Sequence, residues 1–202
     1  MDFSIAILAG GRSRRMGQDK GLAPLGGRAM VEHVLAAAAP LGAEVFLATN
    51  RAEDYAYLGL RIAQDEWPGS GSLEGLRTAL AAAATEKVLV LACDLPFLRR
   101  PLLEHLARQT GEFQALVPRV GGRLHPLVAT YERSCLPEVE AARARGEMSL
   151  QALLETIVLL ELDETHVRNL DPDGLSFINV NSHDELMEAE RIFEAMKQAS
   201  GP

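Results

Sequence analysis

The amino-acid sequence predicts a three-layer α/β domain in which a mainly parallel sheet lies between two layers of helices. Short apolar runs alternate with segments of helical periodicity along most of the 202 residues, which is the pattern of successive strand–helix–strand units. The strongest single observation is Lys87–Ala92, an apolar run without alternation, as in a central parallel strand that is covered on both faces. We therefore expect one domain over residues 1–202.

The first half of the chain supports this class element by element. Phe3–Leu8 is a short apolar run that ends at glycines, and Met30 begins a helical pattern that Pro40 and Gly42 stop. A strand at Glu44–Ala48 follows, so these elements form a unit whose two strands are parallel. The other elements expected here are a turn at 22–27, a strand ending at 62–63, a loop at 68–72, a helix at 73–84, the strand at 87–92 and a helix at 101–108.

The second half predicts further strands and ends in a helix. In Phe177–Asp184 the period of two places Asn179 and Asn181 on the same side of a predicted strand, where they either act on one ligand or form a polar edge. Ser182 and Glu185 then form a capping box that opens the final helix. Before them we expect strands at 114–117, 128–131 and 156–162, a turn at 121–122, helices at 138–147 and 150–154, and a polar loop at 163–174.

The loop after the first strand is the first candidate binding site. Glycines let a ligand approach the backbone, so that several N–H groups converge on anionic oxygens. Arginine and lysine add the charge that phosphate binding needs. The loop thus predicts polyphosphate binding, with a solvated basic turn as the alternative, and it matches neither G-x-G-x-x-G nor the P-loop. The residues concerned are Leu8, Ala9, Gly10, Gly11, Arg12, Arg14, Arg15 and Lys20.

A second group of candidates stands where other strands end. Asp94 follows the central strand, at the edge where ligands bind in open α/β sheets. A short, hard carboxylate suits Mg²⁺ that is held jointly with substrate phosphates, and the alternative is a turn-forming or helix-capping aspartate before Pro96. Asn50 and Asp65 also end strands, and the glycines and hydroxyls of residues 69–72 precede a helix, which makes a further anion-binding corner.

Composition excludes several classes of partner. The formal net charge is −8, so the phosphates of nucleic acids and anionic membranes would be repelled outside a local basic patch. Cys93 and Cys135 stand far apart without a C-x-x-C motif, and we expect two reduced thiols rather than a zinc site. No signal peptide or long apolar span is visible, so we expect a cytoplasmic protein.

The loop carries a resemblance to a known family. From Leu8 to Lys20 the pattern L-A-G-G-x-x-x-R-M-G-x-D-K is similar to the signature loop of nucleotidyltransferases that activate sugars, alcohols and cofactors with a nucleoside triphosphate. Within that superfamily the sequence most resembles the molybdenum cofactor guanylyltransferases. Three later landmarks agree with this resemblance: D-L-P at Asp94, a His-Pro pair at His125, and F-x-N-x-N at residues 177–181.

A fourth landmark of the family is matched only in part. The family's aspartate followed by G-P-L-A-G corresponds to Asp65 and residues 71–75, but Ser72 and Glu74 replace the family's proline and second small residue. His183 lies near the place where the family often has a proline. These departures fall next to expected binding residues, and the sequence does not show which contacts Ser72, Glu74 and His183 make.

The resemblance implies a three-layer αβα, Rossmann-like nucleotidyltransferase domain, with a nucleotide-binding half at about 1–110 and an acceptor-binding half at about 111–202. It implies a Mg²⁺-dependent enzyme that transfers GMP from GTP to the phosphate of molybdenum-loaded molybdopterin, with molybdoenzymes or their chaperones as further candidate partners. The implied catalytic residues are Arg15, Lys20 and Asp94, the last of which is also the metal ligand. The implied nucleotide-binding residues are Leu8, Ala9, Gly10, Gly11, Lys20, Asn50, Asp65, Gly71, Gly75 and Asp94, and the candidates for acceptor binding are Arg123, His125, Asn179 and Asn181.

The identity of the nucleotide base is inferred from a single residue of the loop, and the identity of the acceptor from the resemblance alone. Relatives that use pyrimidine nucleotides commonly have alanine where this chain has Gly10, so the resemblance favours GTP, and the missing Cβ would let a larger purine lie closer to the loop. Two alternatives stay open. One is another nucleotidyltransferase, such as a molybdopterin cytidylyltransferase, a cobinamide-phosphate guanylyltransferase or a sugar-phosphate enzyme, and the other is a non-catalytic nucleotide-binding module of the same fold.

Overall fold

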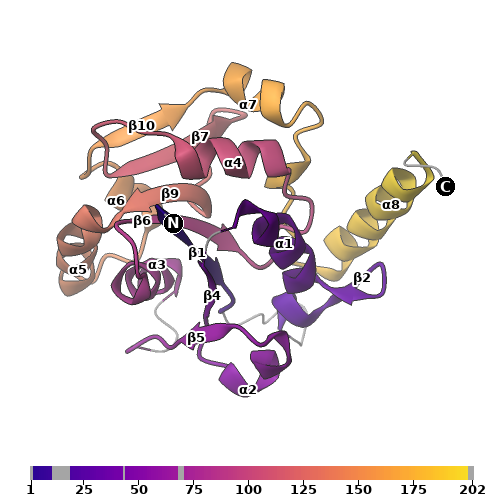
Figure 1. Ribbon diagram of the computed structural model, residues 1–202, viewed down its shortest axis with the longest axis horizontal. Coiled ribbons are helices and arrows are strands. Elements are labelled where there is room, and N and C mark those ends of the chain that lie inside the picture. Colours follow the sequence, from indigo (N-terminus) through magenta and orange to yellow (C-terminus); the bar gives the residue numbers. More distant parts are fainter. Residues whose placement is uncertain (1, 11–18, 43, 68–70, 200–202) are drawn as a thin grey trace.

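The computed structural model describes residues 2–10, 19–42, 44–67 and 71–199, and a mixed sheet forms its centre (Figure 1). The strands follow one another in the order β10-β7-β9-β6-β1-β4-β5, and the short β8 pairs with β7. Their bounds are β1 Phe3–Leu8, β4 Glu44–Ala48, β5 Arg61–Ala63, β6 Lys87–Ala92, β7 Ala115–Val120, β8 Arg123–Leu124, β9 Val128–Glu132 and β10 Leu159–Leu162.

Most neighbouring strands are parallel, as predicted, and their ends meet at one edge. The register pairs Leu8 of β1 with Ala48 of β4 and with Ala92 of β6, so these three strands end at the same level. The exceptions are β9, which is antiparallel to both β6 and β7, and the short β8, which is antiparallel to β7. Because Val128 pairs with Leu91, β9 begins where β6 ends. The segment before β9 therefore joins the carboxyl ends of the parallel strands.

Helices cover both faces of the sheet, which confirms the three-layer prediction (Figure 1). The side chains of β1 alternate between two cores. Ile5 and Ile7 face the helices α1, α4 and α7 on one side of the sheet. Ala6 and Leu8 face α3, α5 and α6 on the other side. The helices are α1 Met30–Ala38, α2 Ala52–Tyr55, α3 Gly71–Ala82, α4 Arg100–Arg108, α5 Leu136–Ala144, α6 Leu150–Leu154, α7 Glu164–Leu170 and α8 His183–Ala199.

The last helix, α8, packs outside these two layers. Its apolar residues share a third core with Leu25 and Met30, next to a hairpin of two short strands, β2 Pro24–Leu25 and β3 Arg28–Ala29, that frames the predicted turn. Ser182 caps the helix as predicted, since its Oγ accepts a hydrogen bond from the Glu185 backbone N–H at 3.3 Å. Among the described residues, none of the helices combines the length and apolarity needed to cross a bilayer.

Two segments were predicted wrongly, and the first precedes the landmark asparagines. Residues 163–174 were expected to form a polar loop, but α7 occupies 164–170. Asp163 caps this helix by accepting from the His166 backbone N–H at 3.0 Å, and Glu164 pairs with Arg168 one turn later. A single buried side chain, Val167, anchors the helix to the core beside α4. With so little apolar periodicity, the capping residues were the only signal of a helix.

The segment that carries Asn179 and Asn181 is also not a strand, which corrects the prediction. Residues 175–177 form a 3-10 turn, and residues 178–182 pair with none of the described strands. The backbone N–H of Val180 instead donates to the Asp94 carbonyl at 2.9 Å, while the Val180 side chain is buried. The expected alternation survives, because one buried residue separates two polar ones.

Several boundaries shift by a few residues. Helix α3 begins at Gly71 rather than at Leu73, which places Ser72 in its first turn, and it ends at Ala82 rather than Ala84. Strand β10 covers 159–162 and not 156–162. At the start of α8, His183 takes the first helical position, where a proline is also well accommodated because its missing N–H would have no helical partner.

The departure at Glu74 has a structural explanation. Its side chain is 1% exposed and points into the packing between α3 and α5, away from the sheet edge. Oε1 accepts from Arg77 Nε at 3.0 Å, and Oε2 lies 3.5 Å from Arg143 Nη1 on α5. The carboxylate thus joins two helices on one face of the sheet. It contributes to stability rather than to ligand binding.

We predict that Glu74→Ala lowers the free energy of unfolding by about 3 kcal/mol, because it leaves the buried Arg77 guanidinium with only the exposed Glu66 carboxylate as a partner. The matched control is Glu188→Ala, which removes the same group from an exposed pair with Arg191 on α8 and should change the free energy by no more than about 0.5 kcal/mol. Chemical denaturation of both variants checks this. Equal effects of the two substitutions would contradict the assignment.

Candidate active site

A cavity of about 890 Å³ opens at the edge of the sheet where β1, β4 and β6 end. Nearly all described residues that the sequence predicted for binding line it, although they come from segments far apart in the chain. Gly11 and Arg15, together with Arg12 and Arg14, lie outside the described residues. The predicted residues in the wall are Leu8, Gly10, Lys20, Asn50, Asp65, Gly71, Gly75, Asp94, Arg123, His125, Asn179 and Asn181.

Ala9 is the exception among the described candidates. It is fully buried and lies outside the cavity wall. Its backbone N–H donates to the Ala48 carbonyl at 2.9 Å, which extends the pairing of β1 with β4 by one residue. Ala9 therefore holds the start of the loop in place beside the cavity.

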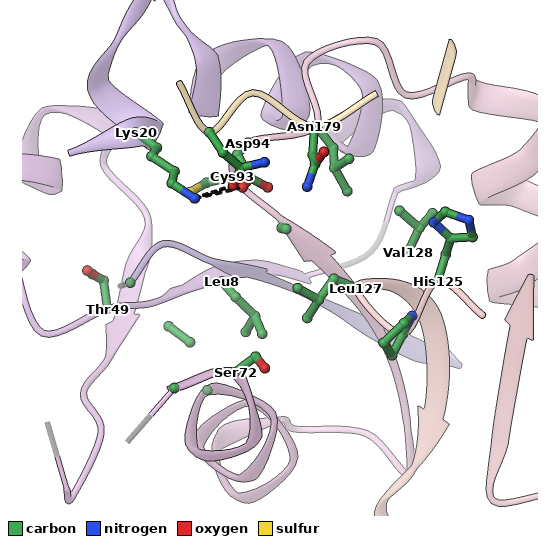
Figure 2. A pocket seen from close by; sticks show the side chains of 18 of the residues that line it. Leu8, Lys20, Thr49, Ser72, Cys93, Asp94, His125, Leu127, Val128 and Asn179 are labelled. Carbon is green, nitrogen blue, oxygen red and sulfur yellow. Dashed lines mark hydrogen bonds and ion pairs between the residues drawn. The ribbon is translucent and has the colours of Figure 1, made fainter. Parts of the chain in front are cut away.

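Three polar side chains meet on one side of the cavity. The Lys20 ammonium lies 3.5 Å from Asp94 Oδ2 and donates a hydrogen bond to Asn181 Oδ1. Figure 2 shows Lys20 and Asp94 pointing toward one another, with Ser72 of α3 across the cavity. The contact joins the 3-10 turn at 20–22, the end of β6 and the segment before α8. It brings together residues that the sequence assigned to the nucleotide and to the acceptor.

Burial and charge act in opposite directions on Asp94. Its side chain is 16% exposed, and this burial raises the pKa of its carboxyl group above the usual value, while the Lys20 ammonium opposes the increase. The carboxylate does not cap the next helix, because Arg99 is the N-cap of α4. Asp94 therefore presents a partly desolvated carboxylate to the cavity, which is a suitable partner for a cation.

Asn50 and Asp65 fix another part of the wall. The Asn50 amide donates to Asp65 Oδ2 at 2.8 Å and accepts from the Asp65 backbone N–H at 3.0 Å. Thr78 of α3 donates to the other carboxylate oxygen at 2.8 Å. Both oxygens of Asp65 are therefore engaged, and the ends of β4 and β5 are tied to α3. These bonds give the cavity a wall of defined shape.

The glycines leave room near the loop. A Cβ on Gly10 would meet no atom of the described residues within 4 Å, whereas a Cβ on Gly75 would lie 3.3 Å from a methyl carbon of Leu8. The departure at Ser72 adds an exposed hydroxyl to this part of the wall. Ser72 gives the cavity a hydrogen-bonding group that proline would lack.

Aromatic and basic side chains line the opposite part of the cavity. The rings of His125 and Phe177 lie 4.5 Å apart at an angle of 56°, and Figure 2 shows Asn179 between Asp94 and His125. Burial lowers the pKa of His125 below its usual value, which favours the neutral ring. The His125 backbone N–H donates to the Pro118 carbonyl at 2.9 Å, so this segment is a structural turn and a cavity wall at once.

The sequence reasoning missed several wall residues, among them two charged ones. Asp19 and Arg51 line the cavity next to Lys20, and Arg51 Nη1 lies 3.2 Å from Asp19 Oδ2. Asp19 is part of the signature pattern, which was a usable signal. Arg51 follows a strand in an ordinary polar turn, and only the fold brings it to Asp19.

Comparisons with known proteins agree with this geometry. A family model described as MobA-like NTP transferase domain matches residues 5–165. A probable molybdenum cofactor guanylyltransferase of Pelotomaculum thermopropionicum is 35% identical, over 93% of this chain and 92% of the relative. Another, of Carboxydothermus hydrogenoformans, is 41% identical over 69% of this chain and 70% of the relative.

A solved structure gives the same result for the fold. The molybdopterin-guanine dinucleotide biosynthesis protein A of Archaeoglobus fulgidus superposes with a TM-score of 0.84 at 28% identity, and the match covers 95% of this chain and 99% of that protein. The family model spans most of the sheet and both sides of the cavity. The chain belongs to the family of MobA-like NTP transferase domains.

Proposed function

We propose that this chain transfers GMP from GTP to the phosphate of molybdenum-loaded molybdopterin, which yields the guanine dinucleotide form of the cofactor and pyrophosphate. The observation that carries the proposal is the meeting of Lys20, Asp94 and Asn181 in the wall of one cavity. The names of the two bacterial relatives and of the archaeal structure support the choice of reaction.

The reaction needs charge and alignment more than proton transfer. An oxygen of the acceptor phosphate forms a bond to the α-phosphorus of GTP, and the bond from that phosphorus to the bridging oxygen breaks, so that pyrophosphate leaves with the electron pair. A phosphate monoester has a second pKa of about 6, so the acceptor is mostly dianionic at neutral pH. It attacks without a general base, and the wall of the cavity accordingly needs cations and oriented donors.

The residues of the nucleotide side take these roles. The Lys20 ammonium neutralises charge on the triphosphate, and the backbone at Gly10 and Gly11 holds the phosphates. Arg15 adds a second cation on the strength of the signature alone, since it lies outside the described residues. The walls around Asn50, Asp65, Gly71 and Gly75 hold the nucleoside. The guanine lies next to Gly10, where the cavity has room.

The residues around Asp94 fit a magnesium ion. The described residues hold no group of three or more histidine, cysteine or acidic side chains that would bind a metal without a ligand. Mg²⁺ is commonly held by one or two carboxylates together with substrate phosphates, and the partly buried Asp94 carboxylate offers such a ligand. Bound there, Mg²⁺ would neutralise charge on the phosphate oxygens. We therefore propose that Mg²⁺ is the cofactor.

The acceptor takes the other side of the cavity in this proposal. Arg123 offers a guanidinium for the acceptor phosphate, and Asn179 and Asn181 offer amides that donate and accept hydrogen bonds. The neutral ring of His125 packs against Phe177 at an angle of 56°, and the two rings offer an apolar surface for a fused ring system. We thus propose that residues of about 1–110 bind the nucleotide and residues of about 111–202 bind the acceptor.

We predict that the purified chain releases pyrophosphate from GTP and Mg²⁺ only when molybdenum-loaded molybdopterin is present. Asp94→Asn should lower the rate on the order of 100-fold, because it removes the charge that binds the metal. Asp173→Asn is the matched control, since Asp173 is exposed and lies outside the cavity wall. Release that does not depend on molybdopterin, or a preference for CTP, would contradict the proposed reaction.

We predict that Gly10→Ala raises the KM for GTP about tenfold, since one methyl group in a fitted pocket costs on the order of 1–3 kcal/mol. No atom in the part of the chain that the structure describes lies within 4 Å of this methyl position, so thermal stability should stay unchanged. The KM for CTP, measured in parallel on both proteins, should change little. An unchanged KM for GTP would show that the purine does not lie against Gly10.

A further inference from the structure

Asp19 is a largely buried carboxylate in the cavity wall, directly before Lys20 in the chain. It is 8% exposed and is the N-cap of the 3-10 turn at 20–22. Oδ1 accepts from the Gly21 backbone N–H at 2.9 Å and from the Tyr55 hydroxyl at 2.6 Å, while Oδ2 faces Arg51. The carboxylate thus connects α2 to the backbone next to the catalytic lysine.

Tyr55 supplies the buried partner of this carboxylate. Its side chain is 1% exposed, and it belongs to the core between the sheet and α1. Burial above all raises the pKa of Tyr55, as does the nearby Asp19 carboxylate, so the hydroxyl stays protonated and donates. A Cβ on Gly21 would collide with this hydroxyl, and it would lie 3.1 Å from Cys93 Sγ. The turn is therefore packed against Tyr55 with no room to shift.

The Lys20 side chain needs such support at its base. Four methylene groups give a lysine many rotamers, and its ammonium must reach a defined point to act on a triphosphate. At its far end, Asn181 and Asp94 hold the ammonium. At its near end, the backbone is held by the bond from Gly21 to Asp19. Loss of the Tyr55 hydroxyl would loosen Asp19 and, with it, the near end of the lysine.

Arg51 differs from Tyr55 in its surroundings. Its side chain is 52% exposed, and its guanidinium also contacts Asp54 at 2.5 Å. It therefore divides its charge between two carboxylates in a solvated position, where ion pairs contribute little. The hydrogen bond from Tyr55 to Asp19 is 2.6 Å long and buried, whereas Arg51 lies 3.2 Å from Asp19. Hydrogen bonds to a charged group are stronger in a buried position than in a solvated one.

We propose that Tyr55 is a positioning residue for nucleoside triphosphate binding, which acts through Asp19 on Lys20. Tyr55 does not line the cavity, and it makes no direct contact with the substrate in this account. The inference rests on the part of the proposed function in which Lys20 binds the triphosphate. It does not depend on the identity of the acceptor.

The test is a double-mutant cycle on triphosphate affinity. Isothermal titration calorimetry with Mg²⁺ and GTP, or whichever of the four nucleoside triphosphates the wild type binds most tightly, gives the Kd and the number of sites for the wild type, Tyr55→Phe, Lys20→Ala and the double variant. Tyr55→Phe should raise the Kd about tenfold with an unchanged number of sites. A merely structural loss would reduce the number of sites and leave the Kd unchanged.

The double variant decides the mechanism. If Tyr55 acts through Lys20, the double variant binds the triphosphate as weakly as Lys20→Ala alone. The control Thr130→Val also removes a buried hydroxyl, one that donates to the Leu106 carbonyl at 2.8 Å outside the cavity wall, and it should leave the Kd unchanged.

Three results would overturn the inference: no change of Kd in Tyr55→Phe, no weakening by Lys20→Ala, or a double variant that is a further tenfold weaker than Lys20→Ala. The proposed function fails on a separate result, the absence of molybdopterin-dependent pyrophosphate release by the wild type. The double-mutant cycle measures only the Kd for the triphosphate and needs no turnover, so the two failures are distinguishable.

Discussion

The contact of Lys20 with Asp94 and Asn181 is the interaction on which the account of this protein depends. Each of the three residues comes from a different segment, and each segment reaches the contact for its own reason. Lys20 follows the loop after β1, and Asp94 follows β6. Asn181 arrives because the backbone of Val180 pairs with Asp94 just before α8 begins. The parallel register of β1 and β6 brings the first two together, and the third closes the cavity around them.

The contact is a balance of charges rather than a strong bond. Burial of Asp94 raises its pKa, and the ammonium of Lys20 only offsets this effect. Partly buried ion pairs gain little free energy, because desolvation cancels much of the attraction. Such an ion pair can break when a ligand offers each group a stronger charge partner. A triphosphate for the lysine and a magnesium ion for the aspartate would replace each partner with a stronger one, and the same groups would then serve both ligands.

Much of this arrangement could be predicted from the sequence, and the parts that could not have physical reasons. Strong signals gave β1, β6, Lys20 and Asp94, because a continuous apolar run followed by glycine or aspartate permits few other structures. Helix α7 was missed because only Val167 is buried in it. The bond from Tyr55 to Asp19 joins residues 36 positions apart, and no local pattern marks a tyrosine whose hydroxyl meets a carboxylate across a turn. The burial of Glu74 likewise depends on a tertiary contact, because the packing of α5 against α3 brings Arg143 to its carboxylate.

The central claim is that the triphosphate and its metal bind at the contact of Lys20 and Asp94. The most direct test is a crystal structure with GTP and Mn²⁺, in which anomalous diffraction locates the manganese. We predict a manganese peak within coordination distance of the Asp94 carboxylate, triphosphate oxygens at the Lys20 ammonium, and the guanine beside Gly10. Manganese and triphosphate bound instead near Arg123 and His125, with Lys20 and Asp94 still paired to each other, would contradict the account.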